Sequence, residues 1–87
     1  MYEVNVKKKV LRGLASLPLQ VIQKFKALLV YLEQQGPVLP FLPNYSKLSE
    51  NTYHCHLSYH YVACWRCEKG TITIEVYYAG SRENAPY

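Results

Sequence analysis

All three histidines of the chain lie in one short stretch, residues 53–67, which reads YHCHLSYHYVACWRC. If the stretch is a strand, His54 and His56 share one face, and Cys55 and Leu57 share the other. We expect the apolar pair to face the helices and the histidines to face the open side. Two histidines about 7 Å apart along a strand can hold a phosphodiester from both sides. Because histidine titrates near neutral pH, one can act as the base and the other as the acid.

The same stretch also suggests a metal site. Cys64 and Cys67 have the spacing of a zinc knuckle, and His54 and His56 could supply two more ligands. However, residues i and i+3 of a strand point to opposite faces, and the chain has no second CxxC pair. We therefore expect neither a metal ion nor another cofactor. A solvated strand with no chemical role remains the alternative to an acid/base pair.

A cationic and a phenolic side chain follow the last apolar strand pattern. Arg82 comes after Gly80 and Ser81, and Tyr87 lies five residues further on. A guanidinium at this place can clamp a phosphate, and a folded-back tail would bring Tyr87 over the histidine face. Such a set suits RNA cleavage by 2′-hydroxyl attack. The base takes the 2′-OH proton, the arginine stabilises the five-coordinate phosphate, and the acid protonates the 5′-oxygen.

Two segments have apolar side chains at helical spacing, and four have the alternation or composition of strands. The predicted helices cover residues 10–17 and about 15 residues that begin at 21, and the predicted strands are 2–6, 52–57, 59–65 and 71–78. Pro18 separates the helices, and Gly36 followed by Pro37 ends the second one. In the last strand Ile72, Ile74, Val76 and Tyr78 are expected on one face.

These elements predict an α+β fold in a single domain, residues 1–87. An N-terminal strand is followed by a helical hairpin and then by a three-stranded antiparallel meander, in the order β-α-α-β-β-β. Both helices are expected on one face of the sheet, because each element must bury its apolar side.

The connection between the two histidine-bearing segments has two interpretations. Residues 57–60, LSYH, contain no Gly, Asn or Asp for a primed turn. Either the hairpin is unusually tight, or the stretch runs straight and pairs across a dimer. In the second case His60 would share the face of His54 and His56.

The composition limits the class of protein. Ten Lys and Arg side chains oppose six Glu and no Asp, which gives a net charge of +4 and favours a polyanionic or acidic partner. Nine tyrosines add rings that can stack on bases. The odd number of cysteines and the lack of a secretory signal favour the cytoplasm. No run of about 20 apolar residues is present, so we expect no membrane span.

The whole chain resembles the RelE/ParE superfamily of toxins from toxin–antitoxin pairs, on the RelE and HigB-like side. The resemblance rests on the helix with its Gly-Pro exit, LPLQVIQKFKALLVYLEQQGPVL, on KLSENTYHCHL, on YVACW and on the tail IEVYYAGSRENAPY. It implies a toxin that cleaves mRNA, usually in the ribosomal A site, and that a cognate antitoxin silences.

The resemblance also assigns roles to residues. The RelE branch uses two alternating lysines on a strand, an arginine on the next strand, and an arginine and a tyrosine in the tail. These positions fall on His54 and His56, near His60, and on Arg82 and Tyr87. Histidines replace the lysines here, which keeps acid/base chemistry but changes the groups that perform it.

Three functions follow as hypotheses. The first is a ribosome-dependent, metal-independent mRNA endonuclease with His54, His56, Arg82 and Tyr87 as catalytic residues and His60 as a further candidate. Its expected contacts to the RNA backbone are Lys47, Lys7, Lys8 and Lys9. The second is a non-enzymatic DNA gyrase inhibitor of the ParE kind, which does not need this constellation. The third is a binding module or an inactive relative.

Overall fold

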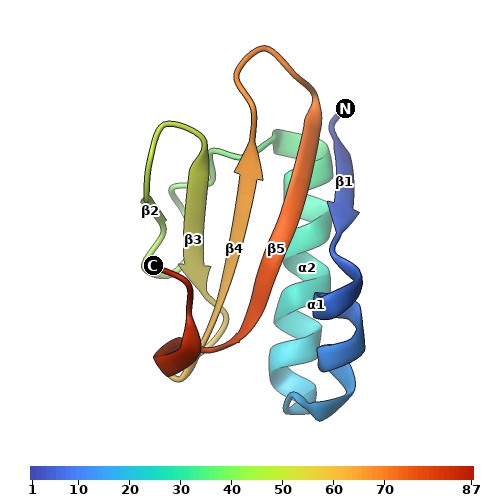
Figure 1. Cartoon of the computed structure of the whole chain (residues 1–87), viewed down its shortest axis with the longest axis vertical. Coiled ribbons are helices and arrows are strands. Elements are labelled where there is room, and N and C mark those ends of the chain that lie inside the picture. Colours follow the sequence, from blue (N-terminus) through green and yellow to red (C-terminus); the bar gives the residue numbers. More distant parts are fainter.

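The computed structural model describes all 87 residues and has one five-stranded sheet (Figure 1). The strands are β1 (Glu3–Val6), β2 (Ser46–Lys47), β3 (Thr52–His56), β4 (Tyr61–Cys67) and β5 (Thr73–Ser81). Their order across the sheet is β1-β5-β4-β3-β2. The first strand pairs in parallel with β5, and all other pairs are antiparallel. The predicted three-stranded meander of β3, β4 and β5 is present, but it is the centre of a larger sheet that has five strands.

The strand that sequence reasoning missed is β2. It has only two residues, which pair with Tyr53 and His54 of β3. Two residues are too few to produce an alternating pattern, so no periodicity could reveal them. The missing strand matters for the site, because it covers the outer edge of the histidine strand.

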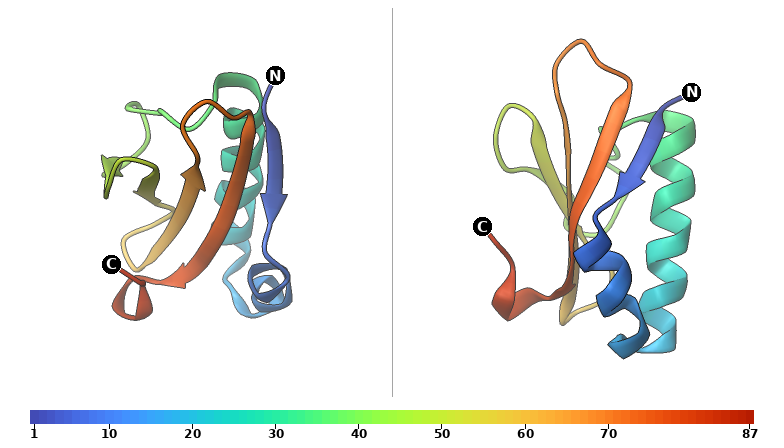
Figure 2. Two further views of the ribbon diagram at one scale, coloured as in Figure 1. Left: turned by 45° about the horizontal axis from the view of Figure 1, so that its top comes forward. Right: turned by 45° about the vertical axis from the view of Figure 1, so that its right-hand side comes forward.

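Two helices and a short 3-10 turn precede the central strands. They are α1 (Lys8–Gly13), η1 (Leu14–Ser16) and α2 (Leu19–Gln35), and both helices lie on one face of the sheet, as predicted (Figure 2). The backbone of Pro18 caps α2 at its start, and Gly36 follows its end with a φ of 90°. A side chain is disfavoured at that φ, so the glycine stop is confirmed.

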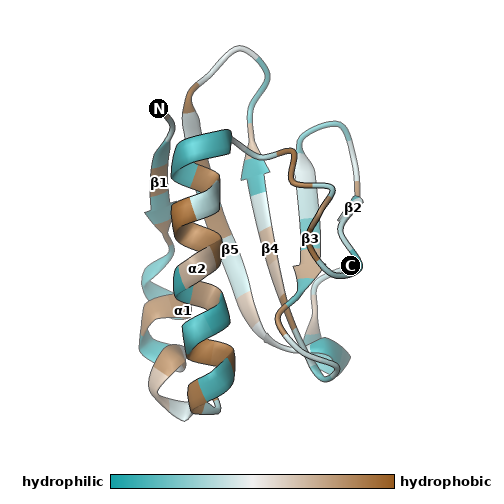
Figure 3. Cartoon of the chain, turned by 180° about the vertical axis from the view of Figure 1, so that it is seen from behind, coloured by the Kyte–Doolittle hydropathy of each residue, from teal (hydrophilic) through white to brown (hydrophobic).

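The apolar stripe of α2 packs on the sheet and makes the core. Val21, Phe25, Leu28 and Leu32 are buried. Hydrophobic and hydrophilic stretches accordingly alternate along the α2 ribbon (Figure 3). Trp65 of β4 is fully buried in this layer, and its indole Nε1 donates a hydrogen bond to the Pro37 carbonyl at 3.0 Å. The bond ties the segment after α2 to the middle of the sheet.

A β-bulge interrupts the pairing of β4 with β5. Cys64 pairs with Tyr78 and Trp65 with Val76, so Tyr77 has no partner. Side chains alternate with a period of two, so one extra residue moves those that follow to the other face. Val76 therefore lies in the core and Tyr78 opposite Cys64 on the other face. The expectation that both share one face is wrong.

The other end of that predicted stripe also differs from the structure. Ile74 is fully buried, but β5 begins only at Thr73, and Ile72 is 62% exposed in the loop before the strand. The predicted strand 71–78 is thus shifted toward the tail by two to three residues.

The tight hairpin is the correct interpretation of residues 57–60. The Leu57 and Ser58 amides both donate to the Tyr61 carbonyl, at 2.8 and 3.2 Å, and β4 returns alongside β3. A straight strand through His60 is therefore wrong. The turn uses residues 58–60, which is why β4 starts two residues later than predicted.

Candidate functional site

His54 and His56 lie side by side on the sheet face opposite the helices. Cys55 and Leu57, the residues between and after them, belong to the core on the helix side. The two imidazole centroids are 5.7 Å apart. The predicted division of the strand into a core face and a histidine face is therefore confirmed, and the pair is close enough to contact one small group.

This face is more covered than an open sheet would be. His54 is only 8% exposed, and its neighbours Val62 and Cys64 are fully buried although neither belongs to the helix-side core. The covering side chains come from β2, from the bulged part of β5 and from the tail. The expectation of a solvated strand face does not fit this burial.

Each histidine is held by a hydrogen bond to its Nδ1 atom. Ser46 Oγ of β2 is 2.8 Å from Nδ1 of His54, and Asn44 Nδ2 is 3.2 Å from Nδ1 of His56. A side-chain amide nitrogen can only donate, so Nδ1 of His56 accepts in this geometry and the neutral ring carries its proton on Nε2. The contact leaves Nε2 as the nitrogen available to a ligand.

The surroundings favour the neutral form of both rings. Burial lowers the pKa of His54 below its usual value, and the neighbouring His56 lowers it further. Burial also lowers the pKa of His56, with a further contribution from the positive charge of Arg82. At neutral pH both imidazoles are therefore free of charge, the state in which an imidazole can accept a proton.

The tail returns over the histidines, as predicted. After β5 the chain forms the short 3-10 turn η2 (Arg82–Asn84), where the Ser81 hydroxyl accepts a hydrogen bond from the Glu83 amide. The Tyr87 ring then lies 4.8 Å from the His54 ring, measured between centroids. In Figure 1 the C-terminus accordingly lies beside β2 and β3. Burial raises the pKa of the Tyr87 phenol, so the phenol keeps its proton at neutral pH.

Arg82 is fixed at the tip of the β3–β4 hairpin. Its backbone amide donates to the His60 carbonyl at 2.7 Å, and its guanidinium lies 5.0 Å from the centre of the Tyr59 ring. A cation over an aromatic face is attractive, so the ring restrains the charged group. The guanidinium is thereby held close to His56.

A pocket of about 440 Å³ lies at His56 and Arg82, whereas His54 and Tyr87 lie outside its lining. His56, Tyr59 and Arg82 line it together with Lys24 from α2. Two permanent positive charges and a neutral imidazole around one pocket suit a phosphate group. Chemically, this end of the sheet can bind a phosphodiester and remove a proton beside it.

His60, the further candidate, lies outside this arrangement. It is an exposed residue of the hairpin turn, and its ring contacts Tyr59 edge-on at 4.7 Å between centroids. Only its backbone carbonyl takes part, as the acceptor for the Arg82 amide. The structure does not bring the His60 side chain to the histidine pair.

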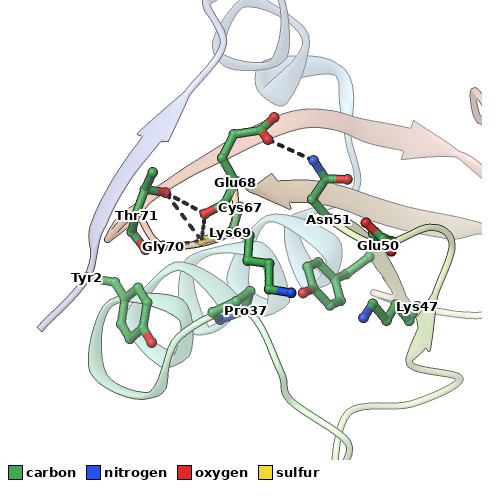
Figure 4. Close-up of a pocket in the computed structure, with 11 residues that line it drawn as sticks. Tyr2, Pro37, Lys47, Glu50, Asn51, Cys67, Glu68, Lys69, Gly70 and Thr71 are labelled. Carbon is green, nitrogen blue, oxygen red and sulfur yellow. Dashed lines mark hydrogen bonds between the residues drawn. The ribbon is translucent and has the colours of Figure 1, made fainter.

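The lysines expected to contact RNA also lie elsewhere. Lys47 pairs with Tyr53, on the helix side of the sheet, and lines a second pocket of about 460 Å³ (Figure 4). Glu50 and Glu68 are also part of that pocket, so its charge is mixed. The run Lys7–Lys9 leads into α1 beside the opposite edge strand, β1 (Figure 1). The structure brings none of the four lysines to the histidine pair.

Several residues around the site could not be recognised from the sequence. Ser46 and Asn44 belong to the proline-rich crossing, where no periodicity predicts which side chains face the histidines. One signal was present: Asn44 follows a proline, and asparagine tolerates the left-handed backbone conformation that it adopts here, with a φ of 51°. It is the only non-glycine residue with a positive φ.

The cysteines do not add a nucleophile or an evident ligand cluster. Burial raises the pKa of Cys55 to about 12 and that of Cys64 to about 11, so both thiols are protonated. Cys67 belongs to the helix-side core and Cys64 faces the other side, as the strand geometry predicted. No group of three or more His, Cys, Asp or Glu side chains has the geometry to hold a metal ion.

Comparisons with known proteins identify the fold. The RelE–RelB complex from Pyrococcus horikoshii OT3 contains a chain 22% identical in sequence, with a TM-score of 0.73 over 97% of this chain and 98% of that one. The isolated Escherichia coli RelE toxin is 17% identical, with a TM-score of 0.73 over 99% and 89% of the two chains. A YoeB/ParE toxin from Agrobacterium tumefaciens is 8% identical, with a TM-score of 0.73 over 92% and 98%.

The likeness extends over nearly the whole length of each chain, so this protein shares the fold of these toxins. The resemblance noted in the sequence is thereby supported at the level of the fold. No protein-family model matches the sequence, and no curated protein matches it. No helix is both long and apolar enough to cross a membrane.

Proposed function

We propose that this chain is the toxin of a toxin–antitoxin pair and that it cleaves mRNA by 2′-hydroxyl attack, in the cytoplasm and on the ribosome. The fold supports the first part, since similar structures are toxins, some of them in complex with the antitoxins RelB or YefM. The second part follows the RelE branch, which the sequence resembles and whose members cleave mRNA. A cognate antitoxin is the expected protein partner.

One observation carries the proposal: two neutral histidines, a restrained arginine and a tyrosine from separate elements converge at one end of the sheet. His54 and His56 come from β3, whereas Arg82 and Tyr87 come from the tail. A strand that only decorated the surface would not require the tail to fold over it. The constellation also needs no metal, in agreement with the chemistry of 2′-hydroxyl attack.

The positions suggest a division of roles. His56 shares the pocket with Arg82 and is neutral at pH 7, so it is the base for the 2′-OH proton. Arg82 stabilises the charge of the five-coordinate phosphate. Tyr87 keeps its proton at neutral pH and is the donor to the 5′-oxygen, while the His54 ring packs against the Tyr87 ring. Lys24 replaces the predicted lysines as the RNA contact nearest the pocket.

A ParE-like inhibitor of DNA gyrase is the second candidate. The fold match with a YoeB/ParE toxin favours it, because the TM-score equals that of the RelE matches. Such an inhibitor would not depend on the histidines. Gyrase-linked DNA breaks without mRNA cuts would therefore identify the second function.

Induced expression of the wild type and two variants tests the proposal. We expect the wild type to arrest growth and to cut mRNA, and the variant with both His54→Ala and His56→Ala to do neither. The matched control is His60→Ala, since that side chain lies outside the pocket, and it should stay toxic. If the wild type leaves mRNA intact, or the double variant cuts it equally well, the endonuclease proposal is wrong.

A further inference from the structure

The side chain of Asn44 forms a hydrogen bond with His56, the less buried of the two imidazoles in the site. The bond joins Asn44 Nδ2 to Nδ1 of His56 at 3.2 Å, and Nδ1 is the only ring nitrogen of His56 that the protein engages through a hydrogen bond. In a neutral imidazole one nitrogen donates and the other accepts. The partner of Nδ1 therefore decides what Nε2 presents to a ligand.

The backbone holds Asn44 in place for this contact. Its φ of 51° is the only left-handed value among the non-glycine residues, and such values persist where the surrounding structure imposes them. The amide of His56 itself donates to the carbonyl of Pro43 at 2.9 Å. Two hydrogen bonds thus fasten residues 43 and 44 to the end of the histidine strand.

We infer that Asn44 is a positioning residue that selects the tautomer of His56, and through it the ability of this imidazole to take a proton. The effect of Asn44 on proton transfer rests on the proposed function, whereas its effect on the tautomer of His56 does not. With its amide nitrogen toward Nδ1, Asn44 keeps the proton on Nε2, and the imidazole can only donate to a ligand.

A half-turn of the amide reverses this state. The oxygen and nitrogen ends of an amide have nearly the same shape, so Oδ1 can occupy the place of Nδ2. Once the ring has given its Nε2 proton to water and taken a proton from water at Nδ1, the Nδ1–H group donates to Oδ1, and the lone pair of Nε2 is free to remove the 2′-OH proton. After the transfer the imidazolium keeps its hydrogen bond to Oδ1. The Asn44 side chain can thus form a hydrogen bond with Nδ1 of His56 in both the resting and the reacting state of the ring.

Other charged and titratable groups act on His56 as well and must be kept constant in a test. Arg82 from the tail and Lys24 from α2 line the same pocket, and Tyr59 from the hairpin lies beside them. The ring of His54, on the same strand, is 5.7 Å away. None of these groups is hydrogen-bonded to Nδ1 of His56, whose hydrogen-bond partner is Asn44.

The test replaces Asn44 in two ways. In Asn44→Gly the left-handed backbone conformation is allowed but the amide is lost, so the tautomers should mix as in water. In Asn44→Asp a carboxylate accepts from Nδ1 and stabilises the imidazolium, so the pKa of His56 should rise by about one to three pH units. The control Asn5→Asp adds the same charge on exposed β1, at the opposite edge of the sheet, and should leave His56 unchanged.

The primary readout is the nitrogen NMR signals of the His56 ring, assigned with the His56→Gln variant, as a function of pH. We expect a single tautomer in the wild type, a mixture in Asn44→Gly and a higher titration midpoint in Asn44→Asp. Identical His56 signals in wild type and Asn44→Gly would overturn the inference. This readout needs no RNA cleavage, so its failure is distinct from failure of the proposed function.

RNA cleavage in single turnover supplies the second readout. In Asn44→Gly the imidazolium loses the acceptor Oδ1 that holds its Nδ1 proton after the transfer, so the rate should fall about ten- to a hundredfold, in line with residues that orient other histidines. In Asn44→Asp the acid limb of the pH–rate profile should move to higher pH together with the NMR midpoint. A slower rate with an unshifted profile in that variant would mean that Asn44 is merely structural.

Discussion

The ring of Tyr87 lies over the ring of His54, with 4.8 Å between the centroids, although 33 positions separate the two residues in the sequence (87 − 54 = 33). The contact joins the tail to the middle of the histidine strand. It explains why a histidine on the face away from the core is nearly as buried as a core residue. It also makes the tail part of the site and not an appendage.

Loss of this cover should change how His54 titrates. Burial is the main cause of its lowered pKa, so Tyr87→Ala should raise the pKa toward the usual value of about 6.5. Tyr87→Phe retains the ring and should leave the pKa of His54 where it is. NMR titration of the imidazole signals measures both. An unchanged pKa in Tyr87→Ala would mean that β2 and β5 alone keep water from the ring.

The two lowered histidine pKa values also predict how stability depends on pH. In the unfolded chain both rings take up protons as the pH falls through about 6.5, whereas in the folded chain they do so only at lower pH. The unfolded state therefore binds more protons in this window, and protonation favours unfolding. The stabilising contribution is complete above about pH 6.5 and is lost as the pH falls toward the folded pKa values.

Urea denaturation at pH 7.5 and at pH 5 measures this loss. The variant His54→Gln, His56→Gln keeps polar side chains but cannot titrate, so most of the difference between the two pH values should vanish. His60 lies exposed in the hairpin turn and is the matched control. The variant His60→Gln should therefore retain the pH dependence of stability of the wild type. Equal stability of the wild type at both pH values would contradict the burial of the pair.

The sequence predicted the structure correctly where a single local pattern determined it. Alternation along β3 placed His54 and His56 on one face, and the Gly36-Pro37 pair located the end of α2. The sequence did not predict the structure where an irregularity interrupted such a pattern. The extra residue Tyr77 in β5 reversed the alternation and moved Tyr78 to the histidine side, and a bulge leaves no periodic signal.

The same limit explains what was missed around the site. Asn44 and Ser46 contact the histidines only because a two-residue strand pairs with β3, and pairing between distant segments is a tertiary effect. Lys47 was expected near RNA because it is basic. Its pairing with Tyr53 instead turns it toward the helix side, which a list of charges does not reveal.

Tyr59 should contribute to cleavage through its ring alone. The guanidinium of Arg82 lies 5.0 Å from the ring centre, and an exposed cation–π contact is worth about 0.5–1 kcal/mol. If the ring holds the arginine for the phosphate, Tyr59→Ala should slow RNA cleavage about two- to fivefold. Tyr59→Phe keeps the ring and should cleave at the wild-type rate.

Single-turnover cleavage rates for the two Tyr59 variants decide between ring and hydroxyl. A loss of activity in Tyr59→Phe would show that the phenol oxygen, and not the ring face, is required. Equal rates for wild type and Tyr59→Ala would show that Arg82 is positioned by its backbone bond to His60 alone.

Two glycines in the helical region should respond to alanine in opposite directions. At Gly36 the φ of 90° disfavours any side chain, and a Cβ atom would lie 2.7 Å from the Tyr2 ring. Gly13 closes α1 with an ordinary helical φ of −81°, and a Cβ atom there would meet nothing within 4 Å. Gly36→Ala should therefore destabilise the protein by about 1–3 kcal/mol. Gly13→Ala should stabilise it by about 0.4–1 kcal/mol, because alanine restricts the unfolded chain. Urea denaturation measures both free energies, and a stabilising Gly36→Ala would contradict the glycine stop at the end of α2.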